Sequence, residues 1–363
     1  MSDNVSTMKE DVAKHLQSNG FILLRVEDID DKKKYIFKNT EGIQATVKEY
    51  QLIKYLKYDE LESKIFIPNE MFDDLQNHMK KAIHIPVAYS FYYLASWLYR
   101  YAKYYDTVAT IKKMKRILGY NPESRGIDYI FKKNGILDTM GYTSTDRDFP
   151  YYWNMEDPPF DNRPAFTMFY HPYVQEALPS DYIGKIHNKF VIKTPIKGLH
   201  RYEEDLKEGH ENGTFFEVDN TTLVPFEVFL YCMANDDLGC TAFYLYSYIK
   251  MKNQIFGGRY DCPMIKLAQE VGLSNTTMKE ALSKLRQHRV IDGIHNQEYF
   301  CVLLPDGERK ANTYIANDYI QFAGVAKPYD KIKVLEANEY LKLEEEKKKE
   351  VEGESFPVEL LPF

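Results

Sequence analysis

Hydrophobic and polar positions follow helical spacing most regularly over residues 266–291, where two amphipathic segments flank one glycine. In the first segment, apolar residues recur about every 3.6 positions, so one face is apolar and the polar residues between them can stay in solvent. That apolar face consists of Ile265, Leu267, Ala268 and Val271. Gly272 should end this helix, and the Ser274 hydroxyl can cap the next one by accepting a backbone N–H of its first turn. The pattern therefore predicts a helix, a tight turn and a second helix.

The second predicted helix divides its residues into two faces at spacings of three and four positions. The inward face consists of Met278, Ala281, Leu282 and Leu285. The outward face is polar and partly basic, and its residues are Asn275, Thr276, Lys279, Ser283 and Lys284. A row of this kind is short enough to enter the major groove of DNA, where side chains can reach the base edges.

The apolar, turn and capping positions of the two predicted helices form one series along the chain: Leu267-Ala268, Val271-Gly272-Leu273-Ser274, Thr277, Leu282, Leu285 and Val290-Ile291. This series resembles the helix-turn-helix of winged-helix DNA-binding domains. The following chain supplies a candidate wing: a strand at Tyr299–Leu304, a turn at 305–307 and a returning strand at Thr313–Ala316, with Arg309 and Lys310 near the tip. The alternative is a winged helix that only docks another protein.

The net charge of −7 over 363 residues argues at first against a nucleic-acid partner. Its distribution along the chain changes that picture. Residues 81–140 carry ten Lys or Arg against four Asp or Glu, a local charge of +6, and residues 240–300 carry eight against five, a local charge of +3. The hydrophobic content of 44% is enough for sizeable cores in two or three domains.

The four cysteines, Cys232, Cys240, Cys262 and Cys301, lack C-x-x-C spacing, so we expect reduced core residues rather than zinc ligands. The N-terminus lacks the pattern of a signal peptide. The longest apolar run, Ile83–Tyr99, is interrupted by polar residues and is shorter than the roughly 20 residues of a membrane span. These observations predict a soluble, cytoplasmic protein.

Residues 1–60 are expected to form a small α+β module. Met8–Gln17 has the pattern of a helix, and Phe21–Val26 with Lys33–Lys38 has the alternation of a β-hairpin whose turn is Asp28–Asp31. This pattern is similar to small β-modules appended to phage DNA-processing proteins, although the Cys and His that those modules often carry are missing. A plain α+β cap is the alternative.

An internal repeat extends the helix-turn-helix interpretation to residues 64–155. Four blocks of residues 216–326 recur there in the same order. They pair Ile67–Phe72 with Val224–Phe229, Phe91–Leu94 with Phe243–Tyr246, Ile111–Asn121 with Met264–Ser274, and Asn134–Asp138 with His288–Asp292. The repeat predicts a first winged-helix domain over residues 64–155 and a second over residues 216–326.

The first copy has its own candidate DNA-contacting residues. Ile83–Tyr104 is expected to be its buried first helix, and Asn121-Pro122 is expected to start its reading helix. The inward face of that helix would be Ile127, Ile130 and Phe131, and the outward face Arg125, Asp128, Tyr129 and Lys132. A cluster of basic residues precedes this helix: Lys112, Lys113, Lys115 and Arg116. The cluster can be interpreted either as contacting phosphates or as an ordinary solvated helix face. The first wing would be Gly141–Trp153, with Arg147 near its tip.

Residues 156–215 are rich in proline and are predicted to form an ordered connector between the two domains. Their histidines lack the spacing of a metal or catalytic site, and the chain lacks a phosphate-binding glycine loop. We therefore expect no metal, no cofactor and no enzymatic activity.

Residues 327–363 are predicted to be a charged helix followed by an exposed tail. The final residues, Glu359-Leu360-Leu361-Pro362-Phe363, are similar to the tail tip of bacterial single-stranded-DNA-binding proteins. That resemblance implies that Leu361, Pro362 and Phe363 dock host replisome proteins by C-terminal capture. A tail without a partner is the alternative.

The expected fold is mainly α with β wings, an α+β class, with two tandem winged-helix domains after the N-terminal module. This arrangement resembles theta-type plasmid replication initiators. The resemblance implies sequence-specific double-stranded DNA binding at origin repeats of a plasmid or phage, with host replisome proteins as partners. A homodimer is compatible with it, and no membrane partner is expected. The alternative is a transcriptional regulator of a mobile genetic element.

Overall fold

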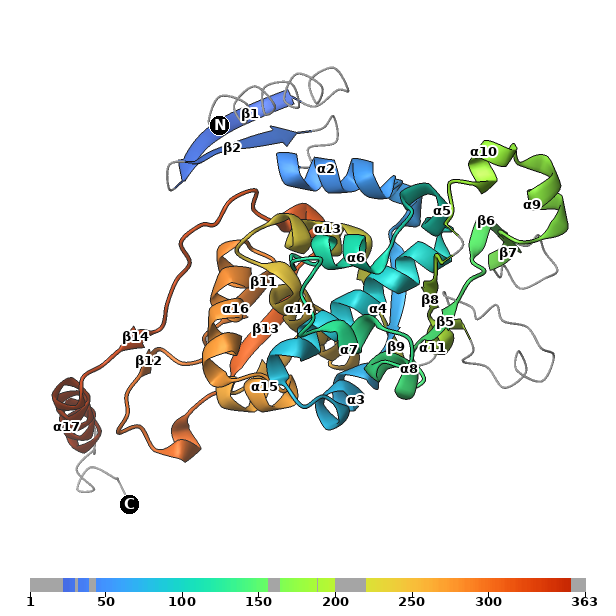
Figure 1. Ribbon diagram of the computed structural model, residues 1–363. Helices are drawn as coiled ribbons and strands as arrows, with labels where there is room; N and C mark the ends of the chain where they lie inside the picture. Colours follow the sequence, from blue (N-terminus) through green and yellow to red (C-terminus); the bar gives the residue numbers. More distant parts are fainter. Residues whose placement is uncertain are drawn as a thin grey trace.

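The computed structural model describes residues 22–29, 32–38, 44–155, 164–187, 189–199 and 220–353, which Figure 1 shows as a ribbon. The predicted helix at Met8–Gln17 and the tail residues Leu361, Pro362 and Phe363 lie outside the described residues. The described chain mixes helices with small sheets of two or three strands, in agreement with the predicted α+β class. Short 3-10 helices lie at Glu60–Glu62, Ala82–His84, Asp306–Glu308 and Tyr319–Gln321.

The N-terminal strands pair as the predicted hairpin, but the strands extend into the expected turn at Asp28–Asp31, since Asp28 and Ile29 pair with Lys33 and Lys32. Strand β1 (Ile22–Ile29) pairs antiparallel with β2 (Lys32–Lys38), and β3 (Gln44–Thr46) pairs with the other edge of β2. Helix α2 (Val47–Leu56) follows directly and packs on α13 (Phe226–Ala234). The Tyr319 hydroxyl donates to the Glu49 carboxylate of α2 at 2.7 Å, so α2 anchors the hairpin to a distant part of the chain.

Two long helices, α4 (Ile85–Arg100) and α14 (Gly239–Ile255), lie side by side at the centre of the molecule. Each follows a strand and a shorter helix: β4 (Lys64–Pro68) and α3 (Met71–His78) precede α4, while β9 (Thr221–Pro225) and α13 precede α14. Strands β4 and β9 pair antiparallel. Every residue of α4 is buried, which confirms an interior helix for most of the long apolar run. The helix is shorter than the expected Ile83–Tyr104, and Ile83 is 66% exposed. Among the described residues, none of the helices combines the length and the apolar character needed to cross a membrane.

The first unit, residues 64–199, continues after α4 through short elements. Strand β5 (Ser144–Asp146) pairs antiparallel with β8 (Ile192–Thr194), and β6 (Pro150–Met155) pairs with β7 (Pro164–Met168). The expected first wing over Gly141–Trp153 does not form, because β5 and β6 pair with later strands instead of with each other. The remaining helices are α5 (Tyr104–Thr107), α6 (Ile111–Ile117), α7 (Asp128–Phe131), α8 (Ile136–Thr139), α9 (Pro172–Ala177), α10 (Ser180–Ile183) and α11 (Ile196–Leu199).

The second unit, residues 221–322, is more regular. After α14 come β10 (Tyr260–Cys262), α15 (Met264–Glu270), α16 (Asn275–Gln287), β11 (Ile291–Ile294) and β13 (Asn312–Ala316). The three strands form an antiparallel sheet in the order β10-β13-β11. The predicted returning strand at Thr313–Ala316 is confirmed. The expected outgoing strand at Tyr299–Leu304 is wrong, because β11 pairs with β13 and β12 (Tyr299–Phe300) pairs parallel with β14 (Lys333–Val334).

One continuous hydrophobic core runs through both units. Trp97 of α4 stacks on Phe226 of α13 with ring centroids 4.0 Å apart, and Phe72 of α3 contacts the rings of Tyr244 and Tyr248 on α14. The four cysteines are buried and free, as expected for reduced core residues. A second, small cluster lies beside α17 (Ala337–Gly353), and it consists of Cys301, Leu304, Leu335 and Tyr340.

Candidate nucleic-acid interface

Helices α15 and α16 meet at the turn that the sequence predicted. Gly272 has a φ of +64°, the left-handed conformation that glycine adopts without strain. Ser274 caps α16, because its Oγ accepts the backbone N–H of Thr277 at 3.1 Å. Both assignments are confirmed. In the predicted inward stripe of α15, three residues are buried, but Ile265 is 61% exposed, so its assignment to the inward face is wrong.

The two faces of α16 match the prediction best in its N-terminal half. Met278, Ala281, Leu282 and Leu285 are buried. Asn275, Thr276 and Lys279 are exposed. Ser283 and Lys284 are half-buried and engaged: the Tyr329 hydroxyl donates to Ser283 Oγ at 2.9 Å, and Lys284 Nζ lies 2.9 Å from Asp237 Oδ1. The exposed part of the row is therefore its N-terminal part.

Gln76 of α3, in the first unit, holds the turn between α15 and α16. Its Nε2 donates to the Glu270 carbonyl. The same side chain lies so close to Gly272 that an added Cβ would be 2.6 Å from Gln76 Cγ. No motif pointed to this contact, because the partners are 194 residues apart in the chain. The orientation of the helix-turn-helix is thus set partly by the other unit.

The loop between β11 and β13, residues 295–311, carries the predicted basic pair. Arg309 and Lys310 are both exposed. The Arg309 guanidinium is engaged on its own loop, since Nη1 lies 2.8 Å from Asp306 Oδ1 and Nε donates to the Leu304 carbonyl at 3.0 Å. These contacts fix the position of one of the two positive charges.

The basic cluster on α6 does not form a single exposed face. Lys112 and Arg116 are exposed, and Lys112 Nζ lies 2.7 Å from Glu123 Oε1. Lys113 is half-buried and donates to the Thr107 carbonyl at 3.2 Å. Of this cluster, Lys112 and Arg116 are the residues best placed to meet a phosphate.

Lys115 points into the protein. Its side chain is 4% exposed, and its ammonium contacts the Asp128 carboxylate and donates to the Ser124 carbonyl at 2.7 Å. The ammonium also lies over the Phe131 ring at 5.5 Å. The expectation that Lys115 belongs to an exposed basic face is therefore wrong, because this lysine anchors the segment that follows α6.

That following segment does not form the expected reading helix. Helix α7 has only four residues and begins at Asp128 instead of Pro122. Asn121 Oδ1 accepts the backbone N–H of Glu123 at 2.9 Å, which closes a turn rather than capping a long helix. The predicted inward residues, Ile127, Ile130 and Phe131, are buried as expected.

The predicted outward residues of this segment differ in exposure. Arg125 and Lys132 are exposed. Tyr129 is half-buried, and its hydroxyl is 2.9 Å from His84 Nδ1. Arg147, between β5 and β6, is exposed. The first unit therefore offers scattered positive charges instead of one polar helix face.

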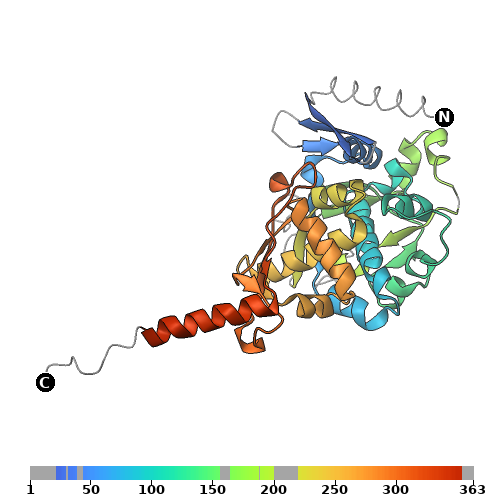
Figure 2. The same cartoon turned by 90° about the vertical axis from the view of Figure 1, so that its left-hand side faces the viewer.

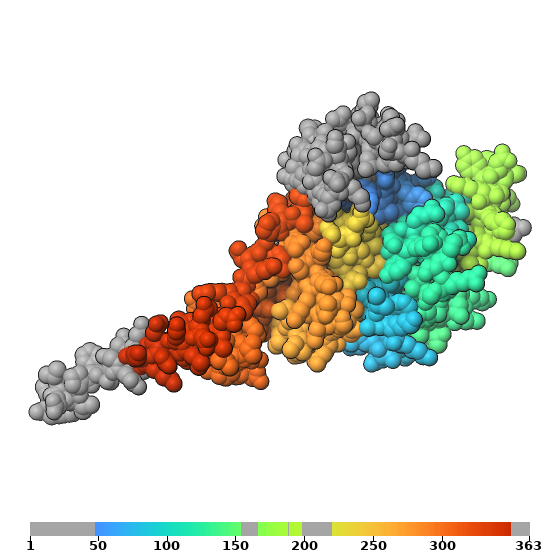
Figure 3. Space-filling model, turned by 60° about the vertical axis from the view of Figure 1, so that its left-hand side comes forward, coloured from blue at the N-terminus to red at the C-terminus, as the bar shows by residue number. Residues whose placement is uncertain are grey.

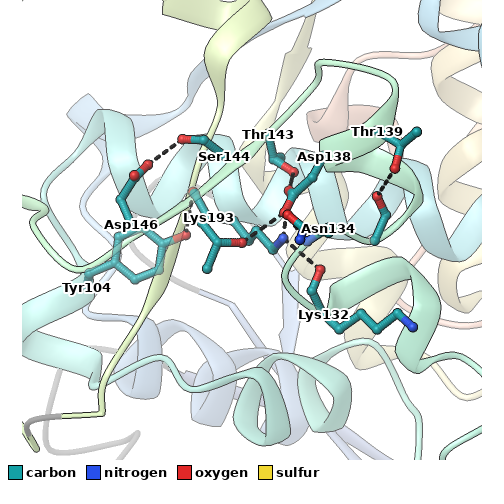
Figure 4. Close-up of polar contacts among 11 residues, drawn as sticks. Tyr104, Lys132, Asn134, Asp138, Thr139, Thr143, Ser144, Asp146 and Lys193 are labelled. Carbon is teal, nitrogen blue, oxygen red and sulfur yellow. Dashed lines mark hydrogen bonds and ion pairs between the residues drawn. The ribbon is translucent and has the colours of Figure 1, made fainter.

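A buried ion pair, shown in Figure 4, ties α8 to β8 beneath this surface. Lys193 Nζ lies 2.6 Å from Asp138 Oδ1 and donates to the Lys132 carbonyl at 3.0 Å, and the Lys193 side chain is 2% exposed. Burial raises the pKa of Asp138, but hydrogen bonds from Lys193 and Thr143 outweigh it, so the pKa is lowered overall. Sequence reasoning missed the pair, because two isolated charges carry no spacing signal.

The surfaces of the two units can be seen from one side of the molecule. Figure 3 shows the orange surface of α15 and α16 and the teal and green surface of α6 to α8 on the same face, with yellow residues of the second unit between them. A single extended ligand could contact both surfaces from this side. Within the described part of the chain, no group of three His, Cys, Asp or Glu side chains is arranged to hold a metal ion.

The comparisons with known proteins reach only the N-terminal part of the chain. A family model described as "Domain of unknown function (DUF5659)" matches residues 3–65, a region that includes the β1–β3 hairpin sheet and α2. No curated protein and no solved structure matches the chain. Helices α15 and α16 and the exposed basic residues of the first unit therefore lie outside the matched residues.

Proposed function

We propose that this chain binds double-stranded DNA sequence-specifically through a winged-helix arrangement in its second unit, and that it is a replication initiator of a plasmid or phage that binds origin repeats. The observation that carries the proposal is the second unit. Its order of helix, strand, helix, helix, strand and strand, with a β10-β13-β11 sheet, is the order of a winged helix. In that fold the helix corresponding to α16 enters the major groove.

The exposed residues of α16 suit base-edge recognition. Asn275 and Lys279 are of types that form specific contacts with adenine and guanine, and Thr276 can donate to or accept from either. Thr276 and Lys279 are three positions apart and Asn275 lies in the same first turn, so one groove could receive all three. Lys310 on the wing loop would contact a flanking phosphate.

The first unit would contribute affinity more than sequence reading. Its exposed cations, Lys112, Arg116, Arg125, Lys132 and Arg147, suit phosphate contacts, which carry little sequence information. If both units engage one duplex, roughly 6–10 phosphate contacts would form and binding would weaken steeply with salt. Lys115 is excluded from this set by its burial.

The test uses the full chain and duplexes selected from a random pool by the protein itself. The double variant Asn275→Ala with Lys279→Ala should lower affinity for the selected duplex by about 1–3 kcal/mol while far-ultraviolet circular dichroism stays unchanged. Lys189→Ala removes one exposed positive charge outside the proposed contact surface and serves as the control. Unchanged affinity in the double variant would refute the assignment of α16 as the reading helix.

Replication and transcriptional regulation are separated by a second experiment. A plasmid that carries this gene and its flanking DNA should replicate autonomously if the chain is an initiator, and a regulator would not confer this property. Deletion of Leu361–Phe363 should then impair replication and spare DNA binding, because the proposed tail contact is with replisome proteins. Replication that is unaffected by the deletion would remove the tail from the proposal.

A further inference from the structure

Residues 327–333, here called the crossing segment, follow the second unit and run along the outside of α16. The backbone N–H of Lys327 donates to the Gln287 carbonyl at 2.8 Å, at the end of α16. One turn earlier in the helix, Ser283 Oγ accepts the Tyr329 hydroxyl. Figure 2 shows the chain descending past α16 to the root of α17. The crossing segment is therefore attached to α16 and is not a free linker.

Arg286 of α16 holds the middle of the crossing segment. Its guanidinium lies over the Tyr329 ring at 4.2 Å, and its Nη2 donates to the Asp330 carbonyl at 3.1 Å. The same Nη2 donates to the Gly293 carbonyl of β11 at 2.8 Å. One side chain of α16 thus joins the crossing segment to the sheet of the second unit. The path of the segment is set by the helix to which we assign base reading.

The crossing segment takes over the outward face of α16 where the exposed row of that helix ends. Ser283 lies four positions after Lys279 and seven after Thr276, so the three residues share one face of the helix. Tyr329 contacts this face at Ser283, which is half-buried. Figure 3 shows the darker orange surface of the segment beside the orange surface of α16. A molecule that lies along this face would therefore meet first α16 and then the crossing segment.

The crossing segment is rich in positive charge. Its charged residues are three lysines and one aspartate: Lys327, Asp330, Lys331 and Lys333. The three lysines are exposed, whereas Ile332 is half-buried, so Lys331 and Lys333 share the outward side of an extended chain. Among the described residues, none of the three ammonium groups pairs with a carboxylate, in contrast to Lys284 and Arg309. The segment therefore presents three unneutralised charges beside the exposed row of α16.

We propose that the crossing segment is a second DNA contact of the second unit, in which Lys327, Lys331 and Lys333 bind phosphates that border the groove entered by α16. The inference rests on the proposed function, because its ligand is the same duplex. A lysine ammonium is a compact point charge that suits a phosphate, and phosphate contacts position a protein without reading sequence. Helix α16 would read the bases, and the crossing segment would fix the position of the helix on the duplex.

The test measures binding of the full chain to two duplexes over a series of salt concentrations. One duplex is selected by the protein from a random pool, and the other is a scrambled sequence of the same length. The variant Lys327→Gln with Lys331→Gln and Lys333→Gln should weaken binding to both duplexes by a similar factor, about tenfold or more at roughly 0.1 M salt. The plot of log K against log salt concentration should become shallower by about 2–3, since each phosphate contact contributes roughly 0.9 to its slope.

Two matched variants separate the charge of this segment from charge and folding in general. Lys342→Gln with Lys348→Gln and Lys349→Gln removes the same number of exposed charges from α17 and should leave the affinity and the salt slope unchanged. Arginine at the three lysine positions of the crossing segment keeps the charge and should retain the wild-type salt slope.

The outcomes distinguish this inference from the proposed function. A wild-type salt slope in the glutamine variant of the crossing segment would overturn the inference and leave the role of α16 intact. A loss of affinity for the selected duplex alone, or an equal loss in the arginine variant, would also overturn it, because phosphate binding depends on charge and not on sequence. A wild-type chain that binds no duplex would refute the proposed function and this inference with it.

Discussion

The α6–α7 segment of the first unit and the α15–α16 segment of the second begin alike and end differently. Each first helix is followed by a glycine with positive φ, +81° at Gly119 and +64° at Gly272. A polar residue with capping chemistry comes two positions later in both. Yet the helix that follows has four residues in the first unit and thirteen in the second.

One of the residues that differ between the two segments is buried in both and is charged in only one. In the aligned blocks, Lys115 of α6 corresponds to Ala268 of α15, and both are buried. A buried ammonium needs acceptors, and Lys115 finds them in the Asp128 carboxylate and the Ser124 carbonyl. The Ser124 carbonyl is held by this bond while the chain around it turns instead of forming a helix. Ala268 needs no acceptor, so α16 can pack on α15 as an uninterrupted helix.

The largest expected effect comes from moving the lysine to the other unit. Ala268→Lys would bury an ammonium against α15 and α16 where the wild-type side chain needs no polar partner, so we expect a loss of about 4 kcal/mol or failure to fold. Urea unfolding of the full chain measures it. Lys115→Ala is the companion variant and should cost less, because the half-exposed Asp128 can be hydrated when its partner is removed. If Ala268→Lys leaves the free energy of unfolding unchanged, this interior position does not determine whether a long second helix forms.

The next effect contrasts a buried ion pair of the first unit with an exposed one of the second. Lys193→Met leaves Asp138 without its ammonium in the interior and should cost about 3–5 kcal/mol. Lys284→Met breaks the half-exposed pair with Asp237, which solvent screens, and should cost less than about 1 kcal/mol. Urea titrations of both variants give the two values. Equal losses would mean that burial does not distinguish the pairs.

The same pair predicts a pH dependence. Because the pKa of Asp138 is lowered in the folded protein, its contribution to stability is fully present above the unfolded carboxyl pKa of about 4 and is lost as pH falls through the folded pKa. Burial also lowers the pKa of Lys193, with Asp138 opposing it. In the acid range the group that titrates is the Asp138 carboxylate, on which an ammonium and two threonine hydroxyls converge. The free energy of unfolding, measured at a series of pH values, should therefore fall less steeply from pH 5 to pH 2 in Lys193→Met than in the wild type.

Local signals predicted the second unit well and the first unit poorly, for a physical reason. Ser274, Gly272 and the inward stripe of α16 act through contacts a few residues away, so spacing in the sequence is enough to identify them. The contacts that shape the first unit join distant residues, such as Lys193 with Asp138 and Tyr104 with the Lys193 carbonyl. A run of lysines on α6 has the same spacing whether a given member is exposed or buried. Lys115 could therefore not be distinguished from Lys112 by pattern alone.

A smaller effect concerns the two glycines. Alanine at either position must adopt a left-handed backbone, at a cost of about 1–2 kcal/mol. Gly119 has nothing within 4 Å of an added Cβ, whereas Gly272 meets Gln76, so Gly272→Ala should cost about 1 kcal/mol more through loss of the Gln76 hydrogen bond. Thermal unfolding of both variants measures the difference. In a Gln76→Ala background the difference should vanish, and its persistence would show that Gln76 does not hold the turn.

The smallest expected effect is the difference in stability lost when each of the two capping residues is replaced by alanine. Ser274→Ala removes the acceptor of the Thr277 N–H at the start of a thirteen-residue helix and should cost about 1 kcal/mol in urea unfolding. Asn121→Ala removes an acceptor that closes one turn before a four-residue helix, so its cost should stay within about 0.5 kcal/mol. Ser274→Ala should also weaken DNA binding if α16 is the reading helix, because fraying would move Asn275 and Thr276. Equal losses of stability in the two variants would mean that the residues after Asn121 are as helical as those after Ser274. The two units would then differ only in the side chains that these helices expose.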